Sequence, residues 1–163
     1  MKVFIDEDCG TGIPKSLRLV KVPKDDLVYP CNHLPIKFGT KDPVWLAWAG
    51  NNGYLVISND RQILENPNEF TLITEHNLGI VFVDNGEYPV WKVLRMLLTR
   101  WEWFEEINRA ERPFVYLVGL TGKPVRYDLE KGPRPPRPLR SQPLKSDPAE
   151  PPPPRPNLQV RLF

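Results

Sequence analysis

The chain has 163 residues, 40% of them hydrophobic and 26% charged, with a formal net charge of +2, and this balance fits one domain with a buried core. No apolar stretch approaches the ~20 residues of a transmembrane helix, and acidic residues come too early for a signal peptide, so we expect a cytoplasmic protein without membrane association. The two cysteines, Cys9 and Cys31, are too few for a disulfide framework, and we expect both to be reduced.

Apolar segments with the length and composition of buried strands recur along the first 130 residues. They fall at residues 2–6, 26–29, 54–58, 79–84 and 114–119. Helices are predicted between or after them at residues 11–19, 42–51 and 88–109. This alternation predicts an α/β fold, a three-layer α/β/α sandwich with a mostly parallel central sheet. Residues 125–129 are expected to add an edge strand.

The last part of the chain differs in charge and in proline content. Residues 131–163 hold seven basic and two acidic side chains, a net charge of +5, whereas residues 1–130 hold 15 basic and 18 acidic ones, a net charge of −3. Residues 151–154 are an uninterrupted run of prolines. We therefore expect a domain at 1–130 and a disordered Pro/Arg-rich tail at 131–163. The tail could bind nucleic acid, serve as a proline-rich peptide ligand, or be a solvated extension.

Acidic residues stand where several of these elements begin or end. Asp6 and Asp60 each follow a predicted strand, and Asp42 opens a predicted helix. Parallel strands bring their carboxyl ends to one edge of a sheet, so the three side chains can converge there. Carboxylates without a matching set of His or Cys suit Mg²⁺ or Mn²⁺, and with such an ion phosphodiester hydrolysis is the chemistry to expect. The alternative is structural: Asp42 would be a helix N-cap and Asp60 a turn residue.

Short motifs at residues 4–8 (FIDED), 39–45 (GTKDPVW) and 54–60 (YLVISND), with Glu69 beyond them, resemble the PIN-like domain family. More narrowly, they resemble the group that contains the VapC-type toxins of toxin–antitoxin modules. The segments 79–83 and 113–118, with the long helix between them, follow in the same order. The resemblance covers about residues 1–130. It implies an α/β/α sandwich and a ribonuclease that depends on Mg²⁺ or Mn²⁺.

Carried over by position, the resemblance makes Asp6 the first metal-binding acid, Asp42 the mid-domain acid and Asp60 the acid after the third strand. The family pattern often has a further acid two residues later, where this chain has Gln62. Other acids could compensate for that departure. They are Asp8, Glu65 and Glu69, and Glu69 is the best placed by the resemblance.

The hypothesis is thus an endoribonuclease acting on RNA, with a cognate antitoxin and a homodimer implied by the toxin-like relatives. The alternative is a non-catalytic PIN-like interaction module with a degenerate acidic site. A Rossmann-like nucleotide binder fits less well, because residues 10–12 (GTG) are too short for the glycine-rich fingerprint. Several cations are candidate phosphate contacts. They are Lys15, Arg18, Lys37, Lys41, Arg61, Arg95 and Arg100.

Overall fold

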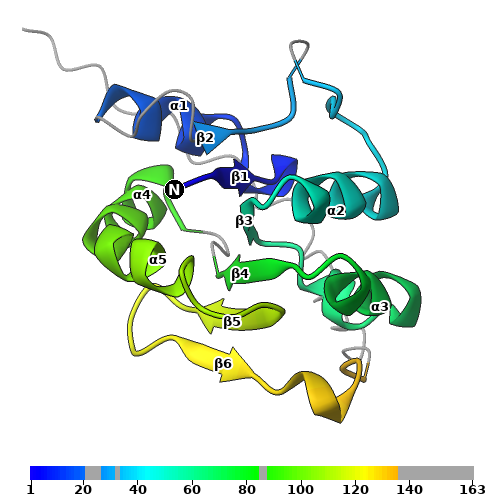
Figure 1. Ribbon diagram of the computed structural model, residues 1–163. Helices are drawn as coiled ribbons and strands as arrows, with labels where there is room; N and C mark the ends of the chain where they lie inside the picture. The colour runs from blue at the N-terminus through cyan, green and yellow to red at the C-terminus, as the bar shows by residue number, and fades with distance from the viewer. Residues whose placement is uncertain (21–26, 32–33, 85–87, 136–163) are drawn as a thin grey trace, which may run out of the picture.

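The computed structural model describes residues 1–20, 27–31, 34–84 and 88–135. At its centre lies a six-stranded sheet with the strand order β2-β1-β3-β4-β5-β6 (Figure 1). The first five strands in sequence pair in parallel, and β6 runs antiparallel to β5 at one edge. Their bounds are β1 (Val3–Ile5), β2 (Leu27–Val28), β3 (Leu55–Ser58), β4 (Gly79–Val83), β5 (Phe114–Val118) and β6 (Val125–Tyr127).

Helices cover both faces of this sheet, which confirms the α/β/α sandwich (Figure 1). On one face lie α1 (Gly12–Leu19), α4 (Val90–Thr99) and α5 (Trp101–Ile107), and on the other lie α2 (Asp42–Asn51) and α3 (Pro67–Glu75). Within the described residues no helix is long and apolar enough to cross a membrane.

The strands form two cores because successive side chains point to opposite faces of a sheet. Ile5 and Ile57 pack among the helices α1, α4 and α5. Phe4 and Val56, their neighbours in sequence, pack among α2 and α3. Phe4 stacks on Trp45 of α2 with ring centroids 5.4 Å apart. This packing fixes the start of α2 against the centre of the sheet.

The helix predicted at 88–109 is two helices, α4 and α5, which meet at Arg100. The Thr99 hydroxyl donates hydrogen bonds to the backbone carbonyls of Arg95 (2.8 Å) and Met96 (3.1 Å). A hydroxyl that bonds to preceding carbonyls in this way bends helices, which explains the break. The helix α3 was not predicted, although Asn66 and Pro67 provide a start signal: the Asn66 side chain caps the helix and Pro67 opens it.

The described chain continues in regular structure beyond the predicted domain boundary. After β6, a short 3-10 helix at Leu129–Lys131 follows, and the Arg134 amide donates to the Leu64 carbonyl at 2.7 Å. The edge strand predicted at 125–129 is confirmed at Val125–Tyr127, where it pairs with β5. Of the tail predicted to be disordered at 131–163, residues 136–163 lie outside the described residues.

Candidate acidic site at the carboxyl edge of the sheet

Asp6 lies at the carboxyl end of β1 and is 4% exposed. Its backbone amide donates to the Ile57 carbonyl at 2.9 Å, so the ladder between β1 and β3 holds it in place. Its carboxylate accepts a 2.7 Å hydrogen bond from the hydroxyl of Ser58, a fully buried residue at the end of β3. The same Ser58 oxygen accepts from the Asp60 amide at 3.0 Å. The Ser58 hydroxyl therefore links Asp6, the first acid of the sequence pattern, to the backbone of Asp60, the third.

The position of Asp6 changes its acidity. The pKa of its carboxyl group is raised to about 6. Burial is the largest cause of this rise, and the charges of Asp8 and Asp42 contribute to it. Hydrogen bonds from Ser58 and from the Glu7 backbone oppose the rise. A buried acid kept partly ionisable by its donors is typical of functional sites.

Asp42 and Asp60 are each fixed by a hydrogen bond to one carboxylate oxygen. The indole nitrogen of Trp45 donates to Asp42 at 2.8 Å, and the Gln62 amide donates to Asp60 at 2.8 Å. Asp42 is the first residue of α2, and Lys41 occupies the N-cap position, so the expected N-cap role of Asp42 was wrong. Its side chain is held by its own helix through Trp45 instead. Asp60 caps the short 3-10 helix Arg61–Leu64, where the structural alternative expected a turn residue.

The charge of Asp42 acts on each of the other four acids of the site. Its charge raises the pKa of Asp6, Asp8, Asp60 and Glu69, each of which is also raised by burial, the largest cause in every case. Glu69, in the first turn of α3, accepts a 2.7 Å hydrogen bond from the Asn66 side chain. The structure thus brings five acids from five places in the chain within electrostatic reach of Asp42 or of one another: the end of β1, the 3-10 helix Glu7–Cys9, α2, the end of β3 and α3.

Charges influence one another over longer distances than those at which ligands coordinate a metal ion. Among the described residues, no group of three or more His, Cys, Asp or Glu side chains is placed to hold a metal ion. Mg²⁺ needs oxygens at about 2.0–2.1 Å from one point, whereas charges act over several times that distance. The donor chemistry, carboxylate oxygens alone, fits a hard cation. The side chains stand apart, so a cation would have to draw them together, and their roles as ligands stay a prediction.

Two further acids at this edge were missed or undervalued from sequence. Glu7 accepts a 2.8 Å hydrogen bond from the Gly39 amide, and it thereby secures the loop that leads to Asp42. Asp84 follows β4 directly and pairs with Arg61 at 3.7 Å. The signal for Asp84 was the same as for Asp6 and Asp60, an acid just after a buried strand.

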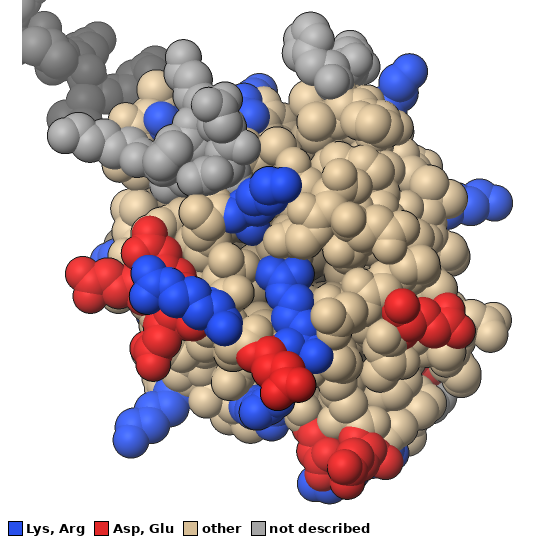
Figure 2. All heavy atoms as spheres, viewed as in Figure 1, with Lys and Arg blue, Asp and Glu red and all other residues tan. Residues whose placement is uncertain are grey.

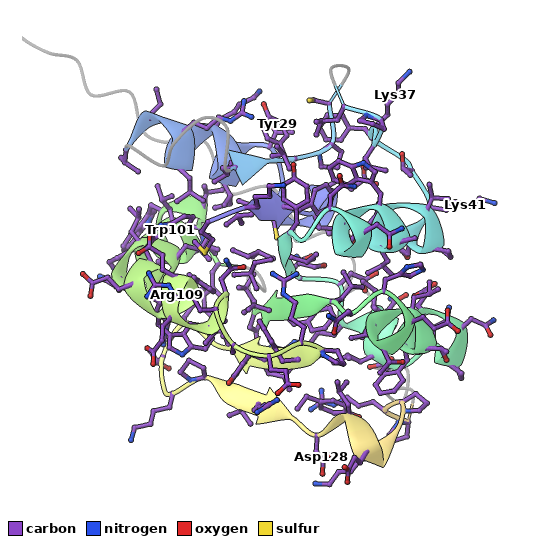
Figure 3. All side chains as sticks on the ribbon, in the orientation of Figure 1. Tyr29, Lys37, Lys41, Trp101, Arg109 and Asp128 are labelled. Atoms are coloured by element: carbon purple, nitrogen blue, oxygen red, sulfur yellow. The ribbon has the colours of Figure 1, made fainter. Side chains whose placement is uncertain are left out.

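The cations named as candidate phosphate contacts differ in their surroundings. Arg18 donates to the Leu27 carbonyl at 3.0 Å and lies over the Tyr29 ring, so it is a structural residue. Lys37 and Lys41, before and at the start of α2, point outward in Figure 3. Burial, with the charge of Asp6, raises the pKa of the Cys9 thiol, which makes it an unreactive core group.

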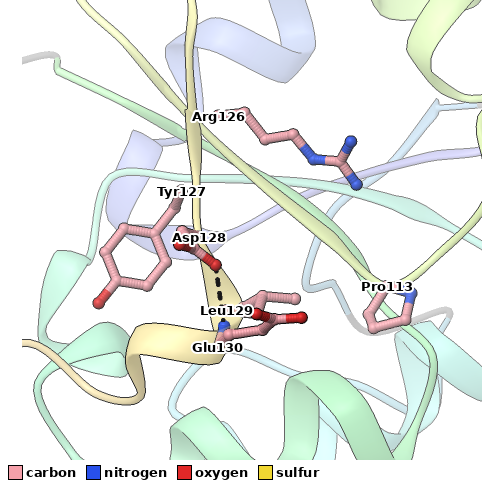
Figure 4. Close-up of a pocket in the computed structure, with 6 residues that line it drawn as sticks. All are labelled: Pro113, Arg126, Tyr127, Asp128, Leu129 and Glu130. Carbon is pink, nitrogen blue, oxygen red and sulfur yellow. Dashed lines mark hydrogen bonds between the residues drawn. The ribbon is translucent and has the colours of Figure 1, made fainter.

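A pocket of about 380 Å³ lies at the opposite edge of the sheet (Figure 4). It is lined by Pro113, which precedes β5, and by residues 126–130. Because Val115 pairs with Tyr127, the end of β6 lies beside the start of β5, away from the acids. The face shown in Figure 2 carries acidic and basic side chains interspersed, without a field of one sign across it. Neither feature competes with the acidic edge as the candidate site.

Comparison with known families agrees with this architecture. A family model described as a PIN-like domain matches residues 1–85, and the chain belongs to this family. The matched span contains every acid of the candidate site, from Asp6 to Glu69. No curated protein and no solved structure gave a significant match.

Proposed function

We propose that the protein is a metal-dependent endoribonuclease whose active site is the acidic edge. The observation that carries the proposal is the gathering of five acids at one edge of the sheet. Burial raises the pKa of Asp6, Asp8, Asp60 and Glu69, and the charge of Asp42 raises the pKa of each of them further. Burying like charges beside one another is unfavourable, and a divalent cation is the group that would offset it. PIN-like domains are often nucleases, which supports the same reading.

In this proposal Asp6, Asp42 and Asp60 hold Mg²⁺ or Mn²⁺, and Asp8 and Glu69 complete its surroundings. When bound, the ion would supply Lewis acidity and an activated water. The residues of the chain have separate tasks. Ser58 orients the Asp6 carboxylate, and Trp45 orients that of Asp42. The hydrogen bonds each occupy one carboxylate oxygen and so limit how each acid turns.

The finer assignment is to the VapC-type toxins, and it rests on the order and spacing of the motifs at 4–8, 39–45 and 54–60. It carries with it two proposed partners, an antitoxin protein and a second copy of the chain.

A second candidate function is a non-catalytic PIN-like interaction module. Two observations favour it: the separation of the acids in the described residues, and Gln62, which contributes its backbone amide to Asp60 where the family pattern often has an acid. This candidate predicts neither cation binding at the acids nor RNA cleavage.

The test is cleavage of total RNA by the purified protein with and without Mn²⁺, beside the Asp6→Asn and Asp60→Asn variants. We expect Mn²⁺-dependent cleavage by the parent and a loss of at least a hundredfold in both variants. Asp128→Asn, a change at the opposite edge of the sheet, is the matched control and should cleave like the parent. RNA cleavage by Asp6→Asn at the parent rate would refute the proposal.

A further inference from the structure

A groove of about 470 Å³ is lined by residues of α4 and by residues that precede α4 and follow β5. Tyr88 and side chains along α4 form one wall, and Leu120 and Thr121, which follow β5, form the other. Three cations lie in its lining, Lys92, Arg95 and Arg100, and the described lining residues include no acid. The groove is thus a local field of positive charge on a body whose sequence is net acidic.

Among the residues that the structure describes, the ion pairs of Arg61 with Asp84 and of Lys131 with Asp128 involve none of these three cations. Arg100 donates to the Gly122 carbonyl at 2.7 Å, which fixes the loop wall of the groove. Lys92 and Arg95, three residues apart, lie on neighbouring positions of one helix face. They are therefore the cations available to a ligand.

An exposed aromatic side chain stands beside these two cations. Trp91 is 56% exposed, and the Lys92 ammonium and the Arg95 guanidinium lie 5.7 Å and 5.4 Å from the centre of its ring. Tyr88, at the start of the groove, is 48% exposed. The residues that α4 turns toward the core are Val93, Met96 and Leu97, which leaves Trp91 on the outside.

We propose that this groove, together with Trp91 beside it, binds single-stranded nucleic acid, with Lys92 and Arg95 on phosphates and the exposed indole stacked on an unpaired base. Cations that follow a backbone beside an aromatic platform are the usual means of holding single strands. An acidic peptide would satisfy the cations but would make little use of an exposed indole.

Part of the groove lining lies near the edge that bears the acids. Tyr88 follows Asp84 by four residues, and the Asp84 amide donates to the Val118 carbonyl at 2.8 Å, two residues before Leu120. Asp84 itself pairs with Arg61, which is adjacent to Asp60. A nucleic-acid strand held in the groove would therefore lie near the acidic site. This inference rests on the proposed ribonuclease function and assigns the place where its RNA is held.

The test is binding of a fluorescent 12-nucleotide uridine oligomer by the full chain, measured by anisotropy in EDTA so that cleavage cannot occur. We expect the double variant Lys92→Glu/Arg95→Glu to raise Kd at least tenfold and to lower the slope of log K against log salt by about two. Trp91→Ala should raise Kd about threefold to tenfold with little change of that slope.

The matched control is Arg109→Glu/Arg126→Glu, which makes the same change of net charge at exposed cations away from the groove. Its Kd should stay within threefold of the parent. Equal losses in both double variants, or no binding by the parent, would overturn the proposal, as would an equally tight, groove-dependent Kd for a labelled oligo-glutamate peptide.

The failure of this inference differs from the failure of the proposed function. Groove-dependent binding together with unchanged cleavage by Asp6→Asn would contradict the ribonuclease site alone. Cleavage that needs Asp6, with binding that ignores Lys92 and Arg95, would contradict the groove alone.

Discussion

At the scale of single residues, Asp6 couples the fold to pH. Its pKa is raised by burial from 3.8 to about 6 in the folded protein. Between these values the folded protein keeps a proton that the unfolded chain has lost. The contribution of this residue to stability is therefore greatest below pH 4, falls as the pH rises through about 6, and is constant above that.

Asp6→Asn should stabilise the metal-free protein at pH 7.5, because the amide keeps an acceptor for Ser58 without a buried charge. A shift of this size corresponds to about 3 kcal/mol at most, and we expect a gain of about 1–3 kcal/mol in urea unfolding. At pH 4 the gain should vanish. Asp128→Asn, an exposed acid, is the control. A loss of stability at pH 7.5 would contradict the claim that the ionised form of Asp6 is unfavourable in the folded protein because it is buried.

Ser58→Ala removes the donor to Asp6 and the acceptor for the Asp60 amide. The pKa of Asp6 should rise further, because the hydrogen bond from Ser58 lowers it. Unfolding should become easier by about 1–3 kcal/mol, the usual cost of buried groups left unpaired. Titration of the Asp6 carboxyl carbon by NMR measures the first effect. Thr71→Ala, which removes an exposed hydroxyl, should leave that pKa unchanged, and an unchanged value in Ser58→Ala would exclude the positioning role.

At the scale of elements, α3 depends on its first residues. Asn66 accepts from the Asn68 amide at 3.1 Å and donates to Glu69 at 2.7 Å. Asn66→Ala should lower the free energy of unfolding by about 1 kcal/mol, as loss of an N-cap does. Asn68→Ala, at an exposed position of the first turn, should change it by less than half as much. Equal effects of the two variants in urea unfolding would show that the cap is not the cause.

Much of the fold could be predicted from sequence because buried parallel strands are short apolar runs with clear ends. Each of the five predicted strands is present, slightly shortened, and α2 spans Asp42–Asn51 as expected. The break at Arg100 could not be predicted, since no glycine or proline marks it and the cause is the Thr99 hydroxyl. The chain also turns into a 3-10 helix at Glu7–Cys9, so Asp8 does not continue β1.

At the site, the ends of the predicted strands could locate Asp6 and Asp60, but the hydrogen bonds that position these residues could not be predicted from the sequence. Ser58 is the polar last residue of a predicted strand, and only the register of β1 with β3 places its hydroxyl on Asp6. Similarly, the bond between Glu7 and Gly39 joins residues 32 positions apart. Contacts of this kind depend on the tertiary structure, which local sequence patterns do not encode.

At the scale of the whole molecule, the residues after β6 belong to the packed body. The Tyr127 hydroxyl donates to the Gly132 carbonyl at 2.7 Å, and Arg134 bonds to Leu64 and lies over the Tyr127 ring. A chain ending at Glu130 should therefore be about 1–3 kcal/mol less stable than one ending at Pro135. The chain ending at Pro135 should match the full chain, given the proline-rich composition that follows. Thermal and urea unfolding compare the three, and equal stability of the two truncated chains would contradict the packing of residues 131–135.

The central claim is that the acids at this edge of the sheet share one cation. Asp42 is the acid whose charge reaches all the others, so Asp42→Asn is the most informative variant. The direct measurement is Mn²⁺ titration followed by electron paramagnetic resonance, with Asp128→Asn as the control. We predict saturable binding by the parent and the control, and a Kd raised at least tenfold in Asp42→Asn. Absence of binding by the parent, or equal binding by Asp42→Asn, would contradict a shared cation site and favour the interaction module.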